Sequence, residues 1–200
     1  MRRIGVFGGT FNPPHVAHYR LALEAVRECA LDEVIIMPTF LPPHKQTELL
    51  LPGEVRMELC KLTFTDRCFS FSDYELNQGG KSYTVKTLRH LKALYPGDRL
   101  FLIIGSDMLL SFDRWFRWQE ILSLCTLIVL SRESSVSTNA LTAFAKDRLQ
   151  LSEGGFYILQ CPPQELSSTQ IRAMLHNGED VSSFLIDDAL QLILEKGYYL

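Results

Sequence analysis

The sequence lacks the cysteine pattern of a disulfide scaffold or a zinc site. Its five cysteines are odd in number and widely spaced, and no two form a C-x-x-C pair. This favours a reducing compartment and gives no sign of a structural metal. Long hydrophobic runs are missing too: no stretch approaches the roughly 18 apolar residues of a membrane span, and Ile4 to Phe7 is too short for a signal peptide. We therefore expect a cytoplasmic protein without a membrane partner.

A strong excess of either charge is also absent. The formal net charge is -3 and the sequence pI is about 6.0, so nothing indicates a general attraction to nucleic acid or to an anionic membrane. Any anionic ligand must be held in a focused pocket. The 200 residues, 46% of them hydrophobic and 22% charged, fit one well-packed domain spanning residues 1–200.

Short runs rich in Val, Ile, Leu and Phe predict buried strands at Arg3–Phe7, Glu33–Met37, Leu100–Ile104, Leu127–Leu130 and Phe156–Leu159. Continuous apolar runs are typical of parallel strands covered on both faces. Helical spacing between them predicts helices around residues 21–31, 55–64, 85–94 and 187–196, the last of which ends at Gly197. The alternation indicates an α/β fold of βαβ units. Residues 133–138 are predicted to form a surface loop, and residues 139–152 fit either a helix or an irregular excursion.

Glycines stand at the carboxyl end of the first expected strand, directly before a helical segment. The stretch reads Gly8-Gly9-Thr10-Phe11-Asn12-Pro13-Pro14-His15-Val16-Ala17-His18. Glycine lets backbone N–H groups approach an anion, and the N-terminus of a helix adds partial positive charge, so a nucleotide should bind here. The spacing matches neither G-x-G-x-x-G nor G-x-x-x-x-G-K-[ST], which removes the main support for a dehydrogenase or a Walker-type enzyme.

His15 and His18 are three residues apart, which places both imidazoles on one face if a helix starts here. Both could then donate to one phosphate. A single histidine is more often an ordinary surface or core residue, but a pair at this spacing after two glycines favours phosphate binding.

A second polar group precedes the last part of the chain. Ser167 and Gln170 fit an S-x-x-Q capping box, which alone predicts only a helix start. Capping does not account for Ser168, Thr169 and Arg172. Two hydroxyls and a guanidinium beside the N–H groups of a helix start would grip polyphosphate oxygens.

These two segments resemble the two signatures of the H-x-G-H nucleotidyltransferase superfamily, and within it the chain most resembles the bacterial nicotinate-nucleotide adenylyltransferases. The resemblance covers nearly the whole length. It includes Pro42-Pro43-His44-Lys45, Ser82-Tyr83-Thr84, Gly105-Ser106-Asp107, Trp115-Phe116 and Tyr198. It implies a Rossmann-like doubly wound parallel sheet with helices on both faces and a helical C-terminal segment.

The resemblance implies that AMP is transferred from ATP to nicotinic acid mononucleotide, which gives deamido-NAD and pyrophosphate. Such a transfer needs no enzyme nucleophile, because alignment and charge stabilisation supply most of the catalysis. Mg2+ is expected to arrive with ATP and to bridge its oxygens, and we assign it no protein ligands.

By analogy with the family, the catalytic contacts to the reacting phosphates come from Thr10, His15, His18, Lys45 and Arg172. The nucleotide is further expected to be held by Gly8, Gly9, Phe11, Gly105, Asp107, Ser168 and Thr169. The nicotinate ring is expected near Thr84 and Trp115, with Lys45 and His15 also on the acceptor side. Without the family pattern, Asp107 would fit a helix cap and Trp115 a core residue.

Two other functions remain open at this point. An adenylyltransferase for nicotinamide mononucleotide or phosphopantetheine would use almost the same phosphate-binding residues, although Thr84 and Trp115 favour a pyridine nucleotide. A nucleotide-sensing module could keep the phosphate site without turnover, but the presence of both histidines, Lys45 and Arg172 argues against it.

Two positions depart from the family pattern. Ala17 stands between the histidines where glycine is usual, and its methyl group could shift the phosphate geometry. Lys86 stands where aspartate is common, which puts the local hydrogen bonding after Thr84 in doubt but not the reaction.

Overall fold

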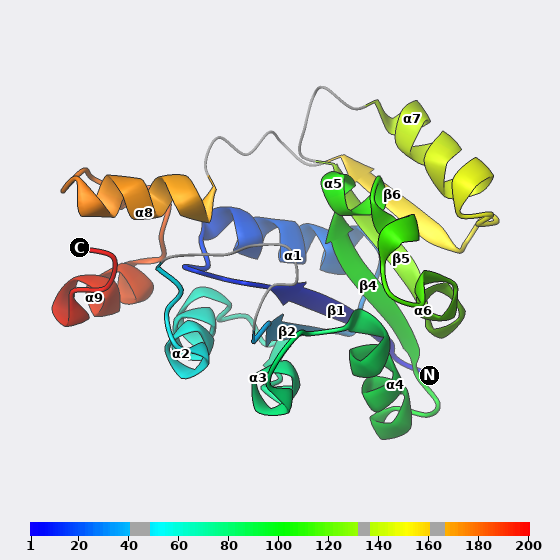
Figure 1. The fold of residues 1–200 in the computed structure, drawn as a ribbon, viewed down its shortest axis with the longest axis horizontal. Helices are drawn as coiled ribbons and strands as arrows, with labels where there is room; N and C mark the ends of the chain where they lie inside the picture. Colours follow the sequence, from blue (N-terminus) through cyan, green and yellow to red (C-terminus); the bar gives the residue numbers. More distant parts are fainter. Residues whose placement is uncertain (41–48, 132–136, 161–166) are drawn as a thin grey trace.

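A parallel sheet forms the centre of the molecule. The computed structural model describes residues 1–40, 49–131, 137–160 and 167–200. Its sheet is six-stranded, in the order β3-β2-β1-β4-β5-β6 (Figure 1). The strands are β1 (Arg3–Gly9), β2 (Glu33–Pro38), β3 (Phe69–Phe71), β4 (Arg99–Gly105), β5 (Cys125–Ser131) and β6 (Phe156–Gln160). The chain starts at β1, moves outward to β3, and returns past β1 to β4. Strand order therefore reverses between β1 and β4, and ligands of doubly wound sheets bind beside the carboxyl ends of strands at such a reversal.

Helices connect the strands and cover both faces. The longer ones are α1 (Val16–Glu28), α2 (Gly53–Thr63), α4 (Thr84–Leu94), α8 (Ser168–His176) and α9 (Asp187–Lys196). The shorter segments are α3 (Tyr74–Gln78), α5 (Ser106–Leu109), η1 (Phe112–Arg114), α6 (Trp118–Leu124), α7 (Thr138–Ala143) and η2 (Phe144–Arg148). Across the described ranges, none of these helices has the length and apolar character needed to cross a membrane.

Alternating residues of each strand enter two separate cores. In β4, Leu100, Leu102 and Ile104 pack with α4, α6 and α7, whereas Phe101 and Ile103 pack with α1 and the end of α2. Successive side chains of a strand point to opposite faces, so a strand that is apolar on both faces is buried between two layers of helices. The predicted doubly wound architecture is confirmed.

A third core lies beside the sheet and joins α2 to the C-terminal helices. It contains Leu59 of α2, Ile171 and Leu175 of α8, Ile193 of α9 and the following Tyr199, all of them buried. Figure 1 shows α2, α8 and α9 together at one end of the molecule, beside the carboxyl end of β1. The predicted helical C-terminal segment is thus packed against α2, beside the end of the sheet where the nucleotide is expected.

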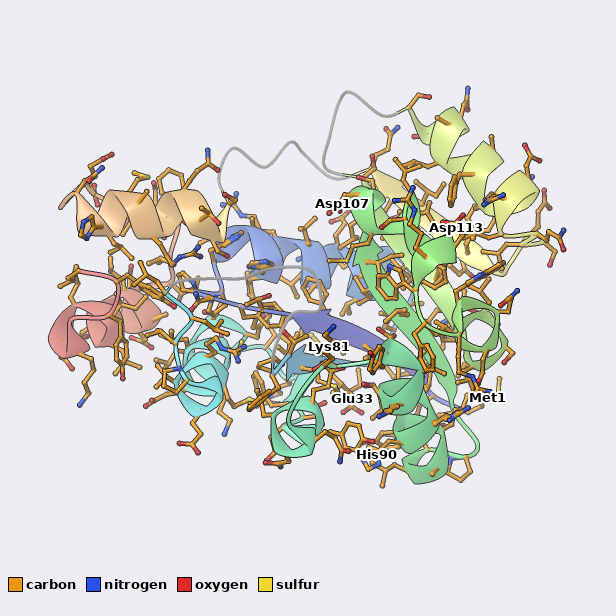
Figure 2. All side chains as sticks on the ribbon, viewed as in Figure 1. Met1, Glu33, Lys81, His90, Asp107 and Asp113 are labelled. Carbon is orange, nitrogen blue, oxygen red and sulfur yellow. The ribbon has the colours of Figure 1, made fainter. Side chains whose placement is uncertain are left out.

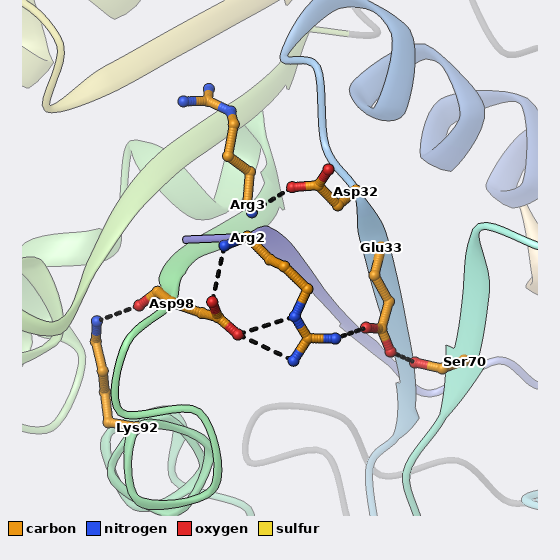
Figure 3. Close-up of polar contacts among 7 residues, drawn as sticks. All are labelled: Arg2, Arg3, Asp32, Glu33, Ser70, Lys92 and Asp98. Carbon is orange, nitrogen blue, oxygen red and sulfur yellow. Dashed lines mark hydrogen bonds and ion pairs between the residues drawn. The ribbon is translucent and has the colours of Figure 1, made fainter.

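The amino ends of the strands are joined by a network of charges (Figure 3). The Arg2 guanidinium bridges Asp98, 2.9 Å away, and Glu33, 3.2 Å away, and Glu33 accepts a hydrogen bond from Ser70. The backbone N–H and guanidinium of Arg2 hold the pKa of the Asp98 carboxyl below its usual range. These contacts join the segments leading into β1, β2 and β4 and reach Ser70 of β3. These ion pairs therefore join neighbouring strands at the amino end of the sheet.

The predicted strands and helices are present, although the helix predicted around residues 21–31 begins and ends earlier, as α1 (Val16–Glu28), and short elements were missed. All five predicted strands are present, and α9 has the predicted bounds. The strand β3 was not predicted, because three residues are too few to show a period. Residues 139–152 are largely helical, as α7 and η2. The loop predicted for 133–138 falls mostly outside the described residues, and Thr138 already belongs to α7.

Candidate active site

The first group of candidate residues lies where β1 ends and α1 begins. Gly8 and Gly9 close the strand, and His15 is the N-cap of α1 in an extended conformation, with φ -148° and ψ 168°. The buried His15 ring lies against that of His18, with 3.8 Å between centroids and 36° between planes. The structure brings the two imidazoles together as their spacing predicts. Their contact with a phosphate remains a prediction.

Phe11 has its side chain in the core. The ring is 2% exposed and makes edge contacts with Phe7, His18 and Phe64, at centroid distances of 5.6, 5.2 and 5.8 Å. Its backbone adopts a positive φ of 47°, a region that side chains rarely occupy. Any contact of Phe11 with ATP must therefore go through its main chain. The Phe11 ring packs against the His18 ring.

The start of α8 reaches the same turn from the other end of the chain. The capping box is confirmed: Ser167 accepts from the Gln170 backbone N–H, and the Gln170 side chain accepts from Ser167. The Ser168 hydroxyl donates to the carbonyl of Pro13 at 2.9 Å, and Arg172 Nη1 donates to the carbonyl of Asn12 at 2.8 Å. The two signature segments are thus in contact although about 155 residues separate them.

Thr169 and Arg172 form a pair at the beginning of this helix. Arg172 Nη2 donates to the Thr169 hydroxyl at 3.3 Å, and Thr169 is exposed. The hydroxyl and the guanidinium therefore lie together at the positive end of the α8 dipole. An anionic group could be held here, and the contact of both residues with polyphosphate stays a prediction.

The expected adenosine site lies at the end of β4. Gly105 is the last residue of that strand and precedes α5, in whose first turn Asp107 is exposed. Figure 2 shows Asp107 at the opposite end of β4 from Met1. Because β1 and β4 are parallel neighbours, Gly105 and Gly9 lie at the same edge of the sheet. The N-cap of α5 is Gly105, and Asp107 lies in the first turn, where a carboxylate also suits the helix dipole.

The expected acceptor site is formed by two segments that the structure places side by side. Thr84 is the first residue of α4, and Trp115 follows η1. Their neighbours Tyr83 and Phe116 contact each other, with ring centroids 5.1 Å apart. Trp115 is half-buried and stacks on Phe112 at 4.9 Å and 28°. A flat ring could therefore meet both a helix N-terminus and an aromatic surface here.

The two departures from the family pattern have simple local environments. Ala17 is buried in the first turn of α1. The ammonium of Lys86 lies over the ring of Tyr83, 5.6 Å from its centroid, so the lysine makes a cation–π contact beside Thr84. Lys45, to which we assigned a catalytic charge, lies outside the described residues.

Glu75 is a residue near the acceptor segments that sequence reasoning missed. Its carboxyl is buried, and it accepts a hydrogen bond from the Thr87 hydroxyl of α4 at 2.6 Å. Burial raises the pKa of Glu75, although the hydroxyls of Thr87 and Ser82 act in the opposite direction. Glu75 thus joins α3 to the first turns of α4. A buried glutamate within a short helix has no sequence signal of its own.

Comparisons with known proteins place the chain in a family. The profile of the cytidylyltransferase-like family matches residues 6–174. A probable nicotinate-nucleotide adenylyltransferase of Geobacter metallireducens is 36% identical over 211 residues, which cover 98% of each chain. Another, of Halalkalibacterium halodurans, is 37% identical over 201 residues, covering 100% of this chain and 92% of that one.

Solved structures show the same fold. The Plasmodium falciparum nicotinic acid mononucleotide adenylyltransferase complexed with APC superposes with a TM-score of 0.79 at 15% identity, covering 100% of this chain and 98% of that chain. The same enzyme complexed with NaAD also gives 0.79, at 16% identity. Because the relatives match along their whole length and the two signature segments meet at the reversal of strand order, the chain belongs to the nicotinate-nucleotide adenylyltransferase family, within the cytidylyltransferase-like group.

Proposed function

We propose that this protein transfers AMP from ATP to nicotinic acid mononucleotide, forming nicotinic acid adenine dinucleotide (deamido-NAD) and pyrophosphate, as a step of NAD biosynthesis. The observation that carries the proposal is that the turn before the His15–His18 pair meets the start of α8 at the carboxyl end of β1. The names of full-length relatives at 36–37% identity support the choice of acceptor.

The reaction is an in-line displacement at phosphorus. A phosphate oxygen of nicotinic acid mononucleotide attacks the α-phosphorus of ATP, and the bond from that phosphorus to the oxygen bridging it to the β-phosphorus breaks. The electron pair leaves with pyrophosphate. Both reactants are anions, so the site must align them and offset their repulsion.

The described residues have suitable groups for each part. His15 and His18 donate to the phosphates that react, and the N–H groups after Gly9 approach them closely. Thr169 and Arg172 hold the departing pyrophosphate. Arg172 can hold pyrophosphate and still donate to the Asn12 carbonyl, since a guanidinium has five N–H donors.

Mg2+ enters this proposal as the partner of ATP. We assign the ion no protein ligands, so the polyphosphate oxygens and water would be its donors. Hard oxygen donors and retained waters suit Mg2+. When bound, the ion offsets charge that develops on the phosphates.

The proposal includes one catalytic domain spanning residues 1–200 and a cytoplasmic location. The continuous sheet and the third core, which joins α2 to α8 and α9, support a single domain. The free thiols of Cys29, Cys60, Cys68 and Cys125 support a reducing compartment.

The test is pyrophosphate release from ATP and Mg2+, measured in parallel with nicotinic acid mononucleotide, nicotinamide mononucleotide and phosphopantetheine. Strong preference for the acid is the expected result. Preference for the amide or for phosphopantetheine keeps the mechanism and overturns the acceptor. Tight ATP binding without release with any acceptor would mean that the protein is a nucleotide sensor.

A further inference from the structure

Asn12 is buried at the centre of a hydrogen-bond network under the predicted phosphate site. Its side chain Nδ2 donates to the Leu49 carbonyl at 2.8 Å. Its Oδ1 accepts from the Leu51 backbone N–H at 3.2 Å and from the Tyr199 hydroxyl at 2.7 Å. This pattern needs a donor at one end of the side chain and an acceptor at the other, which an asparagine has and an aspartate lacks.

Arg56 of α2 enters the same network as a buried cation. It is 1% exposed and donates to three main-chain carbonyls: Thr10 at 2.7 Å, Leu51 at 2.9 Å and Phe40 at 3.4 Å. Within the described part of the chain it forms no ion pair, and the three carbonyl dipoles compensate part of its charge. Burial lowers the pKa of Arg56. Burying a guanidinium is unfavourable unless its N–H groups are hydrogen-bonded. In return, those hydrogen bonds join several segments, which an apolar side chain could not do.

The segments joined in this way all surround the turn that follows β1. Asn12 and Arg56 hold Leu49, Leu51 and Phe40, which are the described residues on either side of 41–48. Arg56 also holds the Thr10 carbonyl. A carbonyl that faces a guanidinium cannot face the polyphosphate, whose oxygens it would repel. The network therefore fixes both the path of the turn and the direction of one of its dipoles.

We infer that Asn12, Arg56 and Tyr199 are positioning residues for ATP. Their network holds the turn from Thr10 to Pro13 in the conformation that receives the phosphates, and it adds a positive charge behind that turn. The inference rests on the proposed function for the identity of the ligand. It assigns a role to the C-terminal Tyr199, whose neighbour Tyr198 is the tyrosine that the sequence pattern favoured.

A matched pair of variants tests the role of the Tyr199 hydroxyl. Tyr199→Phe removes only the donor to Asn12. Tyr198→Phe removes the same group from a half-buried ring whose hydroxyl makes no hydrogen bond with a described residue. The dissociation constant of ATP with Mg2+ is measured by calorimetry. The kcat and both KM values are measured by pyrophosphate release, well below the melting temperature of each variant.

Loss of one buried neutral hydrogen bond corresponds to a change of about 2-fold to 10-fold in a dissociation constant or in kcat/KM. Tyr199→Phe is expected to raise the ATP dissociation constant and to lower kcat/KM for ATP by that factor, with the KM of the acceptor unchanged. Tyr198→Phe is expected to match the wild type. If Tyr199→Phe only lowered the melting temperature and kept the ATP dissociation constant and kcat of the wild type, the positioning role would be overturned.

A second variant extends the test to Asn12. Asn12→Asp keeps the shape of the side chain but places a carboxylate oxygen against the Leu49 carbonyl, and a loss of about 100-fold in kcat/KM for ATP is expected from the displaced turn. Adding Tyr199→Phe to it should change little more, because both act through one network. Should Asn12→Asp not fold, the tyrosine pair decides alone. If the wild type binds ATP but releases no pyrophosphate, the proposed function is refuted. The difference in ATP dissociation constant between Tyr199→Phe and Tyr198→Phe still decides this inference.

Discussion

Replacing Gly9 by alanine tests how tightly the end of β1 is packed. A Cβ atom at this position would lie 2.9 Å from Cζ of the Phe11 ring and 3.1 Å from two further ring carbons. The Phe11 ring cannot move away easily, because the rings of Phe7, His18 and Phe64 surround it at centroid distances between 5.2 and 5.8 Å. The added methyl group must therefore displace the turn that follows β1 or one of these rings.

The size of the effect follows from the packing. Overpacking a rigid site by one methyl group lowers the free energy of unfolding by about 1–3 kcal/mol. For a domain of this length, 1 kcal/mol corresponds to about 2–4 °C in melting temperature, so Gly9→Ala should melt about 2–12 °C below the wild type. Displacement of the Phe11 ring should also disturb His18 and reduce turnover of the folded protein.

Thermal melting of two alanine variants checks this reasoning. Gly8→Ala is the stability control, because the nearest atom to its Cβ, the Met37 carbonyl oxygen, is 3.9 Å away. It should melt close to the wild type. In a Phe11→Leu background the penalty of Gly9→Ala should shrink, since the smaller side chain leaves room. Equal melting temperatures for Gly9→Ala and the wild type, or an equal fall for Gly8→Ala, would refute the packing argument.

Three further variants address other parts of the site. Burial raises the folded pKa of Glu75 above its ordinary 4.5, so the stability gained from the neutral form is complete below about pH 4.5 and is lost as pH rises through the folded pKa. In urea denaturation from about pH 4 to about pH 8, Glu75→Gln should therefore gain on the wild type as pH rises, and a constant difference would contradict this. Ser167→Ala removes the helix cap and should lower stability by about 0.5–2 kcal/mol, or about 1–8 °C in melting temperature; an unchanged melt would count against the cap. His18→Ala should lower kcat by about 100-fold to 1000-fold with a much smaller loss of stability. If the variant instead lost most of its stability while the molecules that remain folded kept a normal kcat, the role assigned to His18 would be excluded.

The sheet could be predicted from the sequence because its strands are buried on both faces. Such strands form continuous apolar runs, as in β4 and β5, and these runs stand out from polar connections. The two signature segments could also be recognised in the sequence, since each is a local pattern beside a glycine pair or a helix start. Their contact is a consequence of the fold, and sequence spacing alone does not show it.

The network around Asn12 could not be predicted, because its members are far apart in the sequence. Arg56 lies in an amphipathic helix, where an arginine normally indicates the solvated face, yet here it is 1% exposed. The choice between Tyr198 and Tyr199 depends on backbone angles after α9: Gly197 and Tyr199 both have positive φ, of 65° and 66°. These angles turn the second tyrosine inward, and no periodicity encodes them.

The hydrogen bond between Tyr199 and Asn12 spans 187 positions of the chain. A ribosome that adds about 5–20 residues per second needs about 10–40 s to make the residues between them. During this interval the first strands and α1 can already form, whereas Asn12 Oδ1 has yet to meet the Tyr199 hydroxyl. The turn predicted to receive ATP therefore lacks its Tyr199 contact until 187 further positions have been added, and a chain stalled before Tyr199 would have a folded sheet with an unfinished turn.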